Sequence, residues 1–345
     1  MAGNSEARTE RLYRALRGIS GVHVTPYDTD GEIDHGVLRR LVAGLAQAGV
    51  HNIVSGGNTG EFFTLTADEV VRLQATAIEA VAGRAVVTAA VGRSLTEAIV
   101  TGRAAQRAGA DAVMAHHPGD PFAAPSAQAD YFISLAEALD LPVMAYLRSD
   151  AIPLADLVRV ATHPNVAAVK FATPNVMLLA ECVRATQGQK AVWICGLAEA
   201  WAVPFYALGT RGFTSGLVNI DPARSLRIWS CLEHGDFSGA RALVTTIAPF
   251  EAMRTKHANG ANVTVVKTAL ELLGWTMGPV RKPGLPKLDP SDREALLQCV
   301  ARFLVLRGKE IARADGVQRV SFRLTVANLP IDHQRCLGIL DGLGV

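Results

Sequence analysis

A short apolar run followed by an amphipathic helical stretch recurs along most of the chain, and this alternation constrains the fold more than any other feature. The runs are nearly all apolar, as in parallel strands that are covered on both faces. They occupy residues 19–25, 52–55, 85–91, 112–115, 142–146, 166–170, 191–195 and 212–215. Eight strand–helix units at a spacing of roughly 25–30 residues are what a closed parallel barrel requires. We therefore expect an α/β fold, a (β/α)8 TIM barrel.

The structural alternative is a doubly wound open sheet, because that fold also alternates strands with helices. Such a sheet usually has a glycine-rich phosphate loop of the form GxGxxG after its first strand. Here the corresponding turn is TPYD at residues 25–28. The sequence therefore favours the barrel.

Helix-start signals support the predicted helices after the second and third strands. Thr66 with Glu69, and Ser94 with Glu97, have the spacing of a capping box, in which each side chain bonds the other residue's backbone N–H. We expect a capping box at both positions.

The alternation stops near residue 236, and helical patterns follow at 237–255, 263–273 and 290–306, with Gly274 placed to end the second. The proline-rich segment 279–290 predicts an extended connection. The barrel therefore has a C-terminal helical appendage. We predict a helical extension at 1–17, the barrel at 18–235, helices at 236–306, and a tail of unknown role at 307–345 with a strand-like run at 320–326.

Charge and composition exclude several classes of protein. The chain has 34 basic and 32 acidic side chains, so no concentrated positive charge indicates a nucleic-acid partner. Hydrophobic residues make up 49%, which is ample for a large core. No apolar run approaches the roughly 20 residues of a membrane span, and the charged N-terminus lacks the apolar stretch of a signal peptide. The five cysteines include no CxxC pair and indicate reduced thiols, so we expect a cytoplasmic protein without a disulfide scaffold.

Lys170 is the strongest candidate for chemistry. It ends the otherwise uncharged strand VAAVKF at 166–171, and the carboxyl ends of barrel strands form the active site. Burial there would lower its pKa toward neutrality, and a neutral amine attacks a ketone to give a Schiff base. The competing interpretation is a lysine that extends to solvent or pairs with an acid.

Two further features lie at the same end of the barrel. The glycine-rich turn at 56–61 brings backbone N–H groups close to a ligand, which suits a carboxylate. Tyr146, at the end of the fifth strand, is a phenol that can relay a proton, although ordinary packing explains it equally well. The glycine-rich turn, the phenol and the amine, in this order along the chain, indicate an active site more specifically than any one of them alone.

The adjacent histidines His116 and His117 follow the fourth strand. Neighbouring strand residues point to opposite faces, so the pair cannot chelate one ion, and we expect no metal and no organic cofactor. One of the two histidines is a candidate proton carrier, because histidine titrates near neutrality.

Over residues 18–304 the sequence resembles the dihydrodipicolinate synthase / N-acetylneuraminate lyase family of class I aldolases. The motifs that match are GNTGE at 57–61, Tyr146, Lys170 and Gly196. Within that family the chain is most similar to 5-dehydro-4-deoxyglucarate dehydratase, through TGEFFTL at 59–65, YLR at 146–148, VVK at 265–267 and GPVR at 278–281.

The resemblance implies that Lys170 forms the imine and that Tyr146 is the acid/base beside it. It also implies substrate contacts at Gly57, Asn58, Thr59, Gly196 and Ser215, and a homotetramer or dimer. The expected activity is that of a lyase acting on a pyruvate-type or sugar-derived 2-oxo acid, by dehydratase or aldolase chemistry.

Three departures from the family pattern keep alternatives open. The synthases have an aromatic pair after strand four, where this chain has PGDP at 118–121, and an arginine where it has Ala151. Strand six continues as FATP at 171–174, where the dehydratases have a Lys-Asp-Gly turn. The second interpretation is therefore 4-hydroxy-tetrahydrodipicolinate synthase, and one of another class is a catalytically impaired barrel that serves as a binding or regulatory protein.

Overall fold

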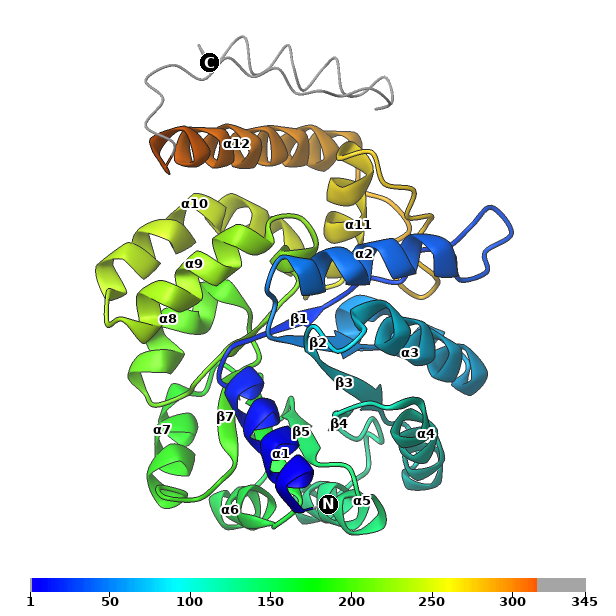
Figure 1. Ribbon diagram of the computed structural model, residues 1–345, viewed down its shortest axis with the longest axis vertical. Coiled ribbons are helices and arrows are strands. Elements are labelled where there is room, and N and C mark those ends of the chain that lie inside the picture. The colour runs from blue at the N-terminus through cyan, green and yellow to red at the C-terminus, as the bar shows by residue number, and fades with distance from the viewer. Residues whose placement is uncertain (1, 315–345) are drawn as a thin grey trace. The chain divides into compact units, whose positions relative to one another are not determined.

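The computed structural model describes residues 2–314, with side chains from 6 to 304. Eight parallel strands close into a barrel in chain order, because β8 pairs with β1 (Figure 1). The strands are β1 (Ile19–Val22), β2 (Asn52–Ser55), β3 (Val86–Val91), β4 (Ala112–Ala115), β5 (Val143–Leu147), β6 (Val166–Phe171), β7 (Val192–Cys195) and β8 (Phe213–Ser215). This confirms the predicted TIM barrel.

Every strand residue is buried, which explains why the strand sequences are apolar runs without alternation. The helices that connect and follow the strands are α2 (His35–Gln47), α3 (Ala67–Val81), α4 (Leu95–Ala108), α5 (Pro125–Ala138), α6 (Leu154–Thr162), α7 (Val176–Ala185), α8 (Glu199–Ala207) and α9 (Pro222–Glu233). Helices α3 to α8 form a ring outside the strands (Figure 1).

The two predicted capping boxes have different outcomes. At α3 both bonds form: Thr66 accepts from the backbone N–H of Glu69, and Glu69 accepts from that of Thr66. At α4 Ser94 accepts from the N–H of Glu97, but the Glu97 carboxylate pairs with Arg93 instead of returning to Ser94. The prediction of a second full box was therefore wrong, because a neighbouring cation competes for the carboxylate.

Helix α1 (Ala2–Leu16) lies against the amino-terminal ends of the strands. Arg8 donates to the carbonyl of Ala110, just before β4, and Arg11 donates to that of Ala85, just before β3. The amino-terminal end of the barrel is thus covered, and the carboxyl ends of the strands are left for a site.

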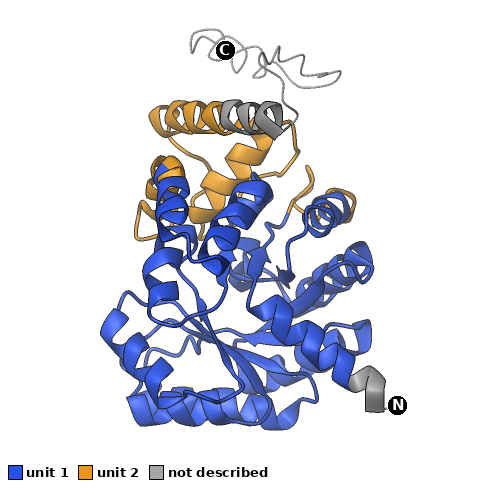
Figure 2. Cartoon of the chain, turned by 60° about the vertical axis from the view of Figure 1, so that its left-hand side comes forward, with its two compact units in different colours: residues 1–25, 38–245 blue, residues 26–37, 246–345 orange. Residues whose placement is uncertain are grey.

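The chain forms two compact units (Figure 2), which divide it differently from the sequence-based parts. Unit 1 is residues 1–25 and 38–245, and unit 2 joins residues 26–37 to the chain from 246 onward. Contacts within unit 2 explain the grouping, because the N–H of Tyr27 donates to the Met277 carbonyl and Arg281 donates to the Gly31 carbonyl. The division at 245 lies inside helix α10 (Phe237–Thr255) and not at 236.

Unit 2 also contains α11 (Asn262–Leu272) and α12 (Pro290–Ala314). The amine of Lys267 and the guanidinium of Arg281 lie over the ring of Tyr27, at 4.2 and 4.4 Å from its centroid. Helix α12 continues past residue 306, after which the sequence pattern predicts the start of the tail. The strand-like run predicted at 320–326 lies outside the described residues.

Between residues 2 and 314 the structure has no helix both long enough and apolar enough to span a membrane.

Candidate functional site

Lys170 and Tyr146 meet at the carboxyl ends of β6 and β5, where they are register partners. The amine of Lys170 lies over the phenol, with Nζ 3.6 Å from the ring centroid. Lys170 is only 4% exposed. The alternative in which this side chain extends to solvent does not fit that burial.

The pKa of Lys170 is lowered from 10.5 to about 7, chiefly by burial and secondly by the positive charge of Arg148, while Cys195 opposes this decrease. No carboxylate is among the groups that set this pKa. Near pH 7, Lys170 is therefore a neutral amine in about half of the molecules, and the neutral amine is the nucleophilic form.

Tyr146 is a neutral phenol in this site. Burial raises its pKa, against the opposing effects of Arg148 and of a hydrogen bond from Asn58. That hydrogen bond runs from Nδ2 of Asn58 to the Tyr146 hydroxyl oxygen at 3.1 Å. The phenol therefore keeps its proton near neutral pH and can give it away as an acid.

The glycine-rich turn positions Asn58 beside Tyr146. Gly56 has a φ of +81°, a conformation that favours glycine, and a Cβ at Gly57 would lie 2.6 Å from Val22 Cγ1. A short 3-10 helix follows at Asn58–Gly60, and Thr25 donates to the carbonyl of Gly60 at 2.7 Å. Thr59 is buried in this turn.

Gly196, at the end of β7, permits close packing beside the residues that follow Lys170. A Cβ on Gly196 would lie 2.9 Å from the carbonyl oxygen of Phe171 and 2.7 Å from Ala172 Cβ. The N–H of Gly196 also donates to that Phe171 carbonyl at 2.8 Å. We infer that this glycine holds the end of β6 in place.

Ser215 is not brought to this group of side chains. Its hydroxyl donates to the buried carboxylate of Glu199, which also accepts from Ser225 at 2.6 Å, and it accepts from the N–H of Val218 at 3.1 Å. These partners come from the helix side of the barrel. Strand β8 has only three residues, so its sequence shows no alternation of apolar and polar residues. The sequence alone therefore could not show which way Ser215 points.

The two histidines diverge, as strand geometry predicts. His116 is buried, and its ring stacks on Phe62 at 4.2 Å and lies 5.7 Å from the ring of Tyr146. His117 lies beside Phe132 at a centroid distance of 6.3 Å. Burial lowers the pKa of His116 to about 3 and also lowers that of His117, so both are neutral near pH 7. A histidine that carries protons needs a pKa near neutrality, and that of His116 lies far below it.

Arg148 is a charged neighbour of this site that the sequence-based site prediction left out. This arginine is exposed, yet its charge acts on the pKa of Lys170, Tyr146, His116 and His117. The signal was available: Arg148 is two residues after Tyr146 on an extended chain, and residues at this spacing share a face.

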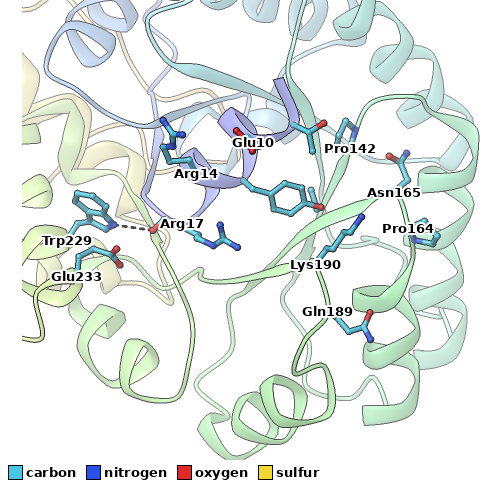
Figure 3. A pocket seen from close by; sticks show the side chains of 13 residues that line it. Glu10, Arg14, Arg17, Pro142, Pro164, Asn165, Gln189, Lys190, Trp229 and Glu233 are labelled. Carbon is cyan, nitrogen blue, oxygen red and sulfur yellow. Dashed lines mark hydrogen bonds between the residues drawn. The ribbon is translucent and has the colours of Figure 1, made fainter. Parts of the chain in front are cut away.

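A hollow of about 1030 Å³ lies at the other end of the barrel, beside α1 (Figure 3). Arg17, Lys190 and Trp229 are among its lining residues, and Trp229 donates to the Arg17 carbonyl. It contains none of the predicted site residues. The chemistry is therefore expected at the carboxyl ends of the strands. Among the described residues, no cluster of three or more histidine, cysteine, aspartate or glutamate side chains could hold a metal ion.

Comparison with known proteins places this geometry in context. Residues 15–301 match the Dihydrodipicolinate synthetase family. A 4-hydroxy-tetrahydrodipicolinate synthase of Methanoculleus marisnigri is 34% identical over 81% of this chain and 97% of its own length. A probable 5-dehydro-4-deoxyglucarate dehydratase of Rhizobium rhizogenes is 29% identical over 82% of this chain and 94% of its own.

Among solved structures, the dihydrodipicolinate synthase from Oceanobacillus iheyensis superposes with a TM-score of 0.83 at 34% identity. That superposition covers 86% of this chain and 99% of the other.

Proposed function

The chain belongs to the dihydrodipicolinate synthetase family and is a lyase, and on that premise we propose that it forms an imine between Lys170 and a 2-oxo acid. The observation that supports this most directly is the buried amine of Lys170, 3.6 Å above the ring of Tyr146. Such an amine, with a pKa of about 7, is both nucleophilic and shielded from water.

The proposed reaction starts when Nζ attacks the ketone carbon, C2. The carbinolamine loses water to give the imine, and Tyr146 supplies the proton to the departing hydroxyl. The resulting phenolate then takes a proton from C3, which leaves an enamine. In the dehydratase direction the electron pair of the enamine expels the hydroxyl from C4, which leaves as water with the proton that Tyr146 took from C3. In the aldolase direction the imine itself accepts the C3–C4 electron pair while the phenolate takes the proton of the C4 hydroxyl, which gives an aldehyde and the enamine.

We keep Gly57, Asn58 and Thr59 as the proposed contacts for the substrate carboxylate, as the family resemblance implies. Gly196 enters as the residue that permits packing against the end of β6. Ser215 stays outside the proposal, because its hydroxyl is bound to Glu199.

We propose a sugar-derived 2-oxo acid as the substrate, with chemistry like that of 5-dehydro-4-deoxyglucarate dehydratase. The exposed guanidinium of Arg148 supports it, because a cation beside the imine suits an acidic substrate that extends from Lys170. Relatives that have the dehydratase name are 29% and 30% identical to this chain.

The second candidate is 4-hydroxy-tetrahydrodipicolinate synthase, which is the name of the relative that is 34% identical. Two sequence features count against it, namely the absence of tyrosine after β4 and the presence of Ala151. The two candidates differ in a simple assay. A synthase condenses pyruvate with an aldehyde, whereas a dehydratase releases water from a single hydroxylated 2-oxo acid.

Borohydride reduction in the presence of pyruvate tests the shared first step. We expect a covalent adduct on Lys170, located by peptide mapping, and its loss in Lys170→Met. Lys190→Met is the matched control, because Lys190 lies at the opposite end of the barrel and the variant should keep the adduct. Without an adduct in the unmodified protein, the chain would be a binding or regulatory barrel and not a Schiff-base enzyme.

We also propose a homo-oligomer, either a tetramer or a dimer, on the family resemblance alone. Light scattering coupled to size exclusion measures the mass in solution, and a monomeric mass would overturn this part of the proposal.

A further inference from the structure

The proposed function assigns the substrate carboxylate to the turn at 57–59, whose backbone N–H groups can donate to it. Two hydrogen-bond acceptors flank Tyr146 without a donor of their own, and an acceptor cannot hold a carboxylate, so both remain for other groups of the substrate. One is Oδ1 of Asn58, which is buried and has no hydrogen-bond partner among the described residues. The other is the second ring nitrogen of His116, for the reasons that follow. A buried acceptor without a donor, such as Asn58 Oδ1, costs about 1–3 kcal/mol, so a ligand that supplies donors relieves that cost.

The tautomer of His116 follows from its surroundings. Nε2 lies 3.1 Å from the carbonyl oxygen of Gly56, and a carbonyl only accepts, so Nε2 holds the proton. The ring is neutral because burial lowers its pKa to about 3. Nδ1 therefore has the lone pair, and none of the residues that the structure describes donates a hydrogen bond to it.

The orientation of His116 is fixed by packing. Its ring stacks on Phe62 with an interplanar angle of 25° and meets the edge of Phe63 at 5.1 Å. Gly92, at the end of β3, leaves room for it, because a Cβ there would lie 2.9 Å from His116 Cβ and 3.2 Å from Phe62 Cε1. A ring held on this many sides is a preorganised acceptor.

The position of His116 relative to Lys170 indicates which part of a substrate it would meet. The residues Lys170, Tyr146 and His116 lie at the ends of the consecutive strands β6, β5 and β4. Neighbouring strands lie about 4.8 Å apart, so β4 is about 10 Å from β6. An imine on Lys170 places C2 at β6 and Tyr146 next to C3, which leaves His116 for groups farther along the chain.

We propose that His116 is a specificity-determining residue, which accepts a hydrogen bond at Nδ1 from a hydroxyl on the chain of the 2-oxo acid, while Asn58 Oδ1 accepts from another. This inference rests on the proposed function. It selects polyhydroxylated 2-oxo acids over aliphatic ones, because an acceptor lacking a donor penalises a substrate without hydroxyls. His116 then binds the substrate and transfers no proton.

The test compares two six-carbon acids, 2-oxo-3-deoxygluconate and 2-oxohexanoate, which differ in their hydroxyls. For each acid, borohydride trapping on Lys170 gives the concentration that produces half-maximal adduct. The readout is the ratio of the two concentrations, in the unmodified protein and in three variants. His116→Phe retains an aromatic ring but removes the acceptor, His116→Asn retains an acceptor, and His117→Phe is the matched control.

We expect His116→Phe to shift the ratio about tenfold against the hydroxylated acid, since that loss corresponds to one hydrogen bond of about 1.4 kcal/mol. His116→Asn should recover part of the preference, and His117→Phe should leave the ratio as in the unmodified protein. An unchanged ratio in His116→Phe, or the same shift in His117→Phe, would overturn the assignment. Absence of any adduct in the unmodified protein would overturn the proposed function, and this inference with it.

Discussion

At the scale of single residues, the charge state of Lys170 is set by what surrounds it. An amine on a solvated strand end keeps a pKa near 10.5, but Lys170 lies under the protein surface with Arg148 as a positively charged neighbour. Both effects disfavour the ammonium form, and only the first would persist without Arg148. The neutral amine that the proposed chemistry needs therefore depends chiefly on burial and in part on Arg148, a residue outside the proposed pair of Lys170 and Tyr146.

The pH dependence of imine trapping should report this charge state. Because the pKa of Lys170 is lowered to about 7, the neutral amine increases as pH rises through 7. We expect the initial rate of adduct formation with pyruvate to rise about tenfold per pH unit below 7 and to level off above about 8. A rate that keeps rising to pH 10 would show an ordinary lysine.

Replacing Arg148 by Gln should move this profile in a known direction. Removal of the positive charge raises the pKa of Lys170, so the rise in trapping rate moves to higher pH. Arg184→Gln is the control, because Arg184 is exposed on α7, away from the carboxyl end of β6. A profile that moves to lower pH, or moves equally in both variants, would contradict the role given to Arg148.

Tyr146→Phe separates imine formation from turnover. The ring that covers the amine is retained, so the burial of Lys170 persists, but the phenolic proton is lost. We expect the final yield of trapped adduct at saturating pyruvate to persist, although the adduct forms more slowly because Tyr146 supplies a proton in imine formation. We expect kcat to fall about 100- to 1000-fold, which is the range for loss of a general acid. If the final yield of adduct fell as far as kcat, the role of the hydroxyl in the steps after imine formation would be contradicted.

How far the sequence could predict the site differs from residue to residue. Lys170 was recognisable because a lone charge ends an apolar strand, and Tyr146 because it occupies the same position one strand earlier. The bond from Asn58 to Tyr146 joins residues 88 positions apart and depends on the conformation of the glycine turn. The neutral state of His116 depends on burial by Phe62 and Phe63, which spacing along the chain does not show.

At the scale of secondary structure, the contact between the end of β7 and the end of β6 should be sensitive to one methyl group. Gly196→Ala places a Cβ 2.9 Å from the Phe171 carbonyl, so one of the two backbones has to move. We expect loss of imine trapping through displacement of Lys170, with about 1–3 kcal/mol less stability from overpacking. Differential scanning calorimetry and the trapping assay measure the two effects.

Gly44→Ala is the matched control, because this glycine lies in helix α2 and a Cβ there meets nothing within 4 Å. The added methyl should stabilise the helix by about 0.5–1 kcal/mol and leave trapping unchanged. The prediction for Gly196 fails if both alanine variants behave alike.

Element by element, the strands and helices could be predicted because their signals are local. A buried parallel strand is apolar throughout, and Thr66 bonds a residue three positions away. The competition for Glu97 by Arg93, and the grouping of residues 26–37 with the chain from 246 onward, were not predicted. Both depend on a residue or segment outside the motif itself, and the motif gives no sign of it.

At the scale of the whole molecule, the buried neutral bases make folding stability depend on pH in two separate ranges. His23 bonds Ser55 and the Val24 carbonyl inside the barrel, and burial lowers its pKa to about 4, with His116 at about 3. In the unfolded chain both return to the ordinary value of 6.5. Between the folded and unfolded values the unfolded state binds more protons, so stability rises with pH and is lost as pH falls below 6.5.

Lys170 acts in a higher range with the same sign. Its folded pKa of about 7 lies below the unfolded 10.5, so the unfolded state again binds more protons between these values, and stability rises from pH 7 to 10.5. At pH 7 the buried lysine therefore destabilises the fold by roughly 3–5 kcal/mol, because a difference of one between the folded and unfolded pKa values corresponds to about 1.4 kcal/mol. Lys170→Met should accordingly be more stable than the unmodified protein at pH 7.

Denaturant unfolding monitored from pH 5 to 10 distinguishes the two ranges. Between pH 5 and 6.5 His23 and His116 together give a slope of roughly 2 kcal/mol per pH unit, which decreases as pH approaches the unfolded value of 6.5. His51 and His117 add to it because burial lowers their pKa as well. His116→Phe should remove about half of the part due to His23 and His116, and leave the upper range unchanged. Lys170→Met should flatten the upper range and leave the lower one, because below pH 7 the lysine is protonated in both states. If one variant changed the slope of stability against pH in both ranges, the lysine and the histidines would titrate as a coupled group and not independently.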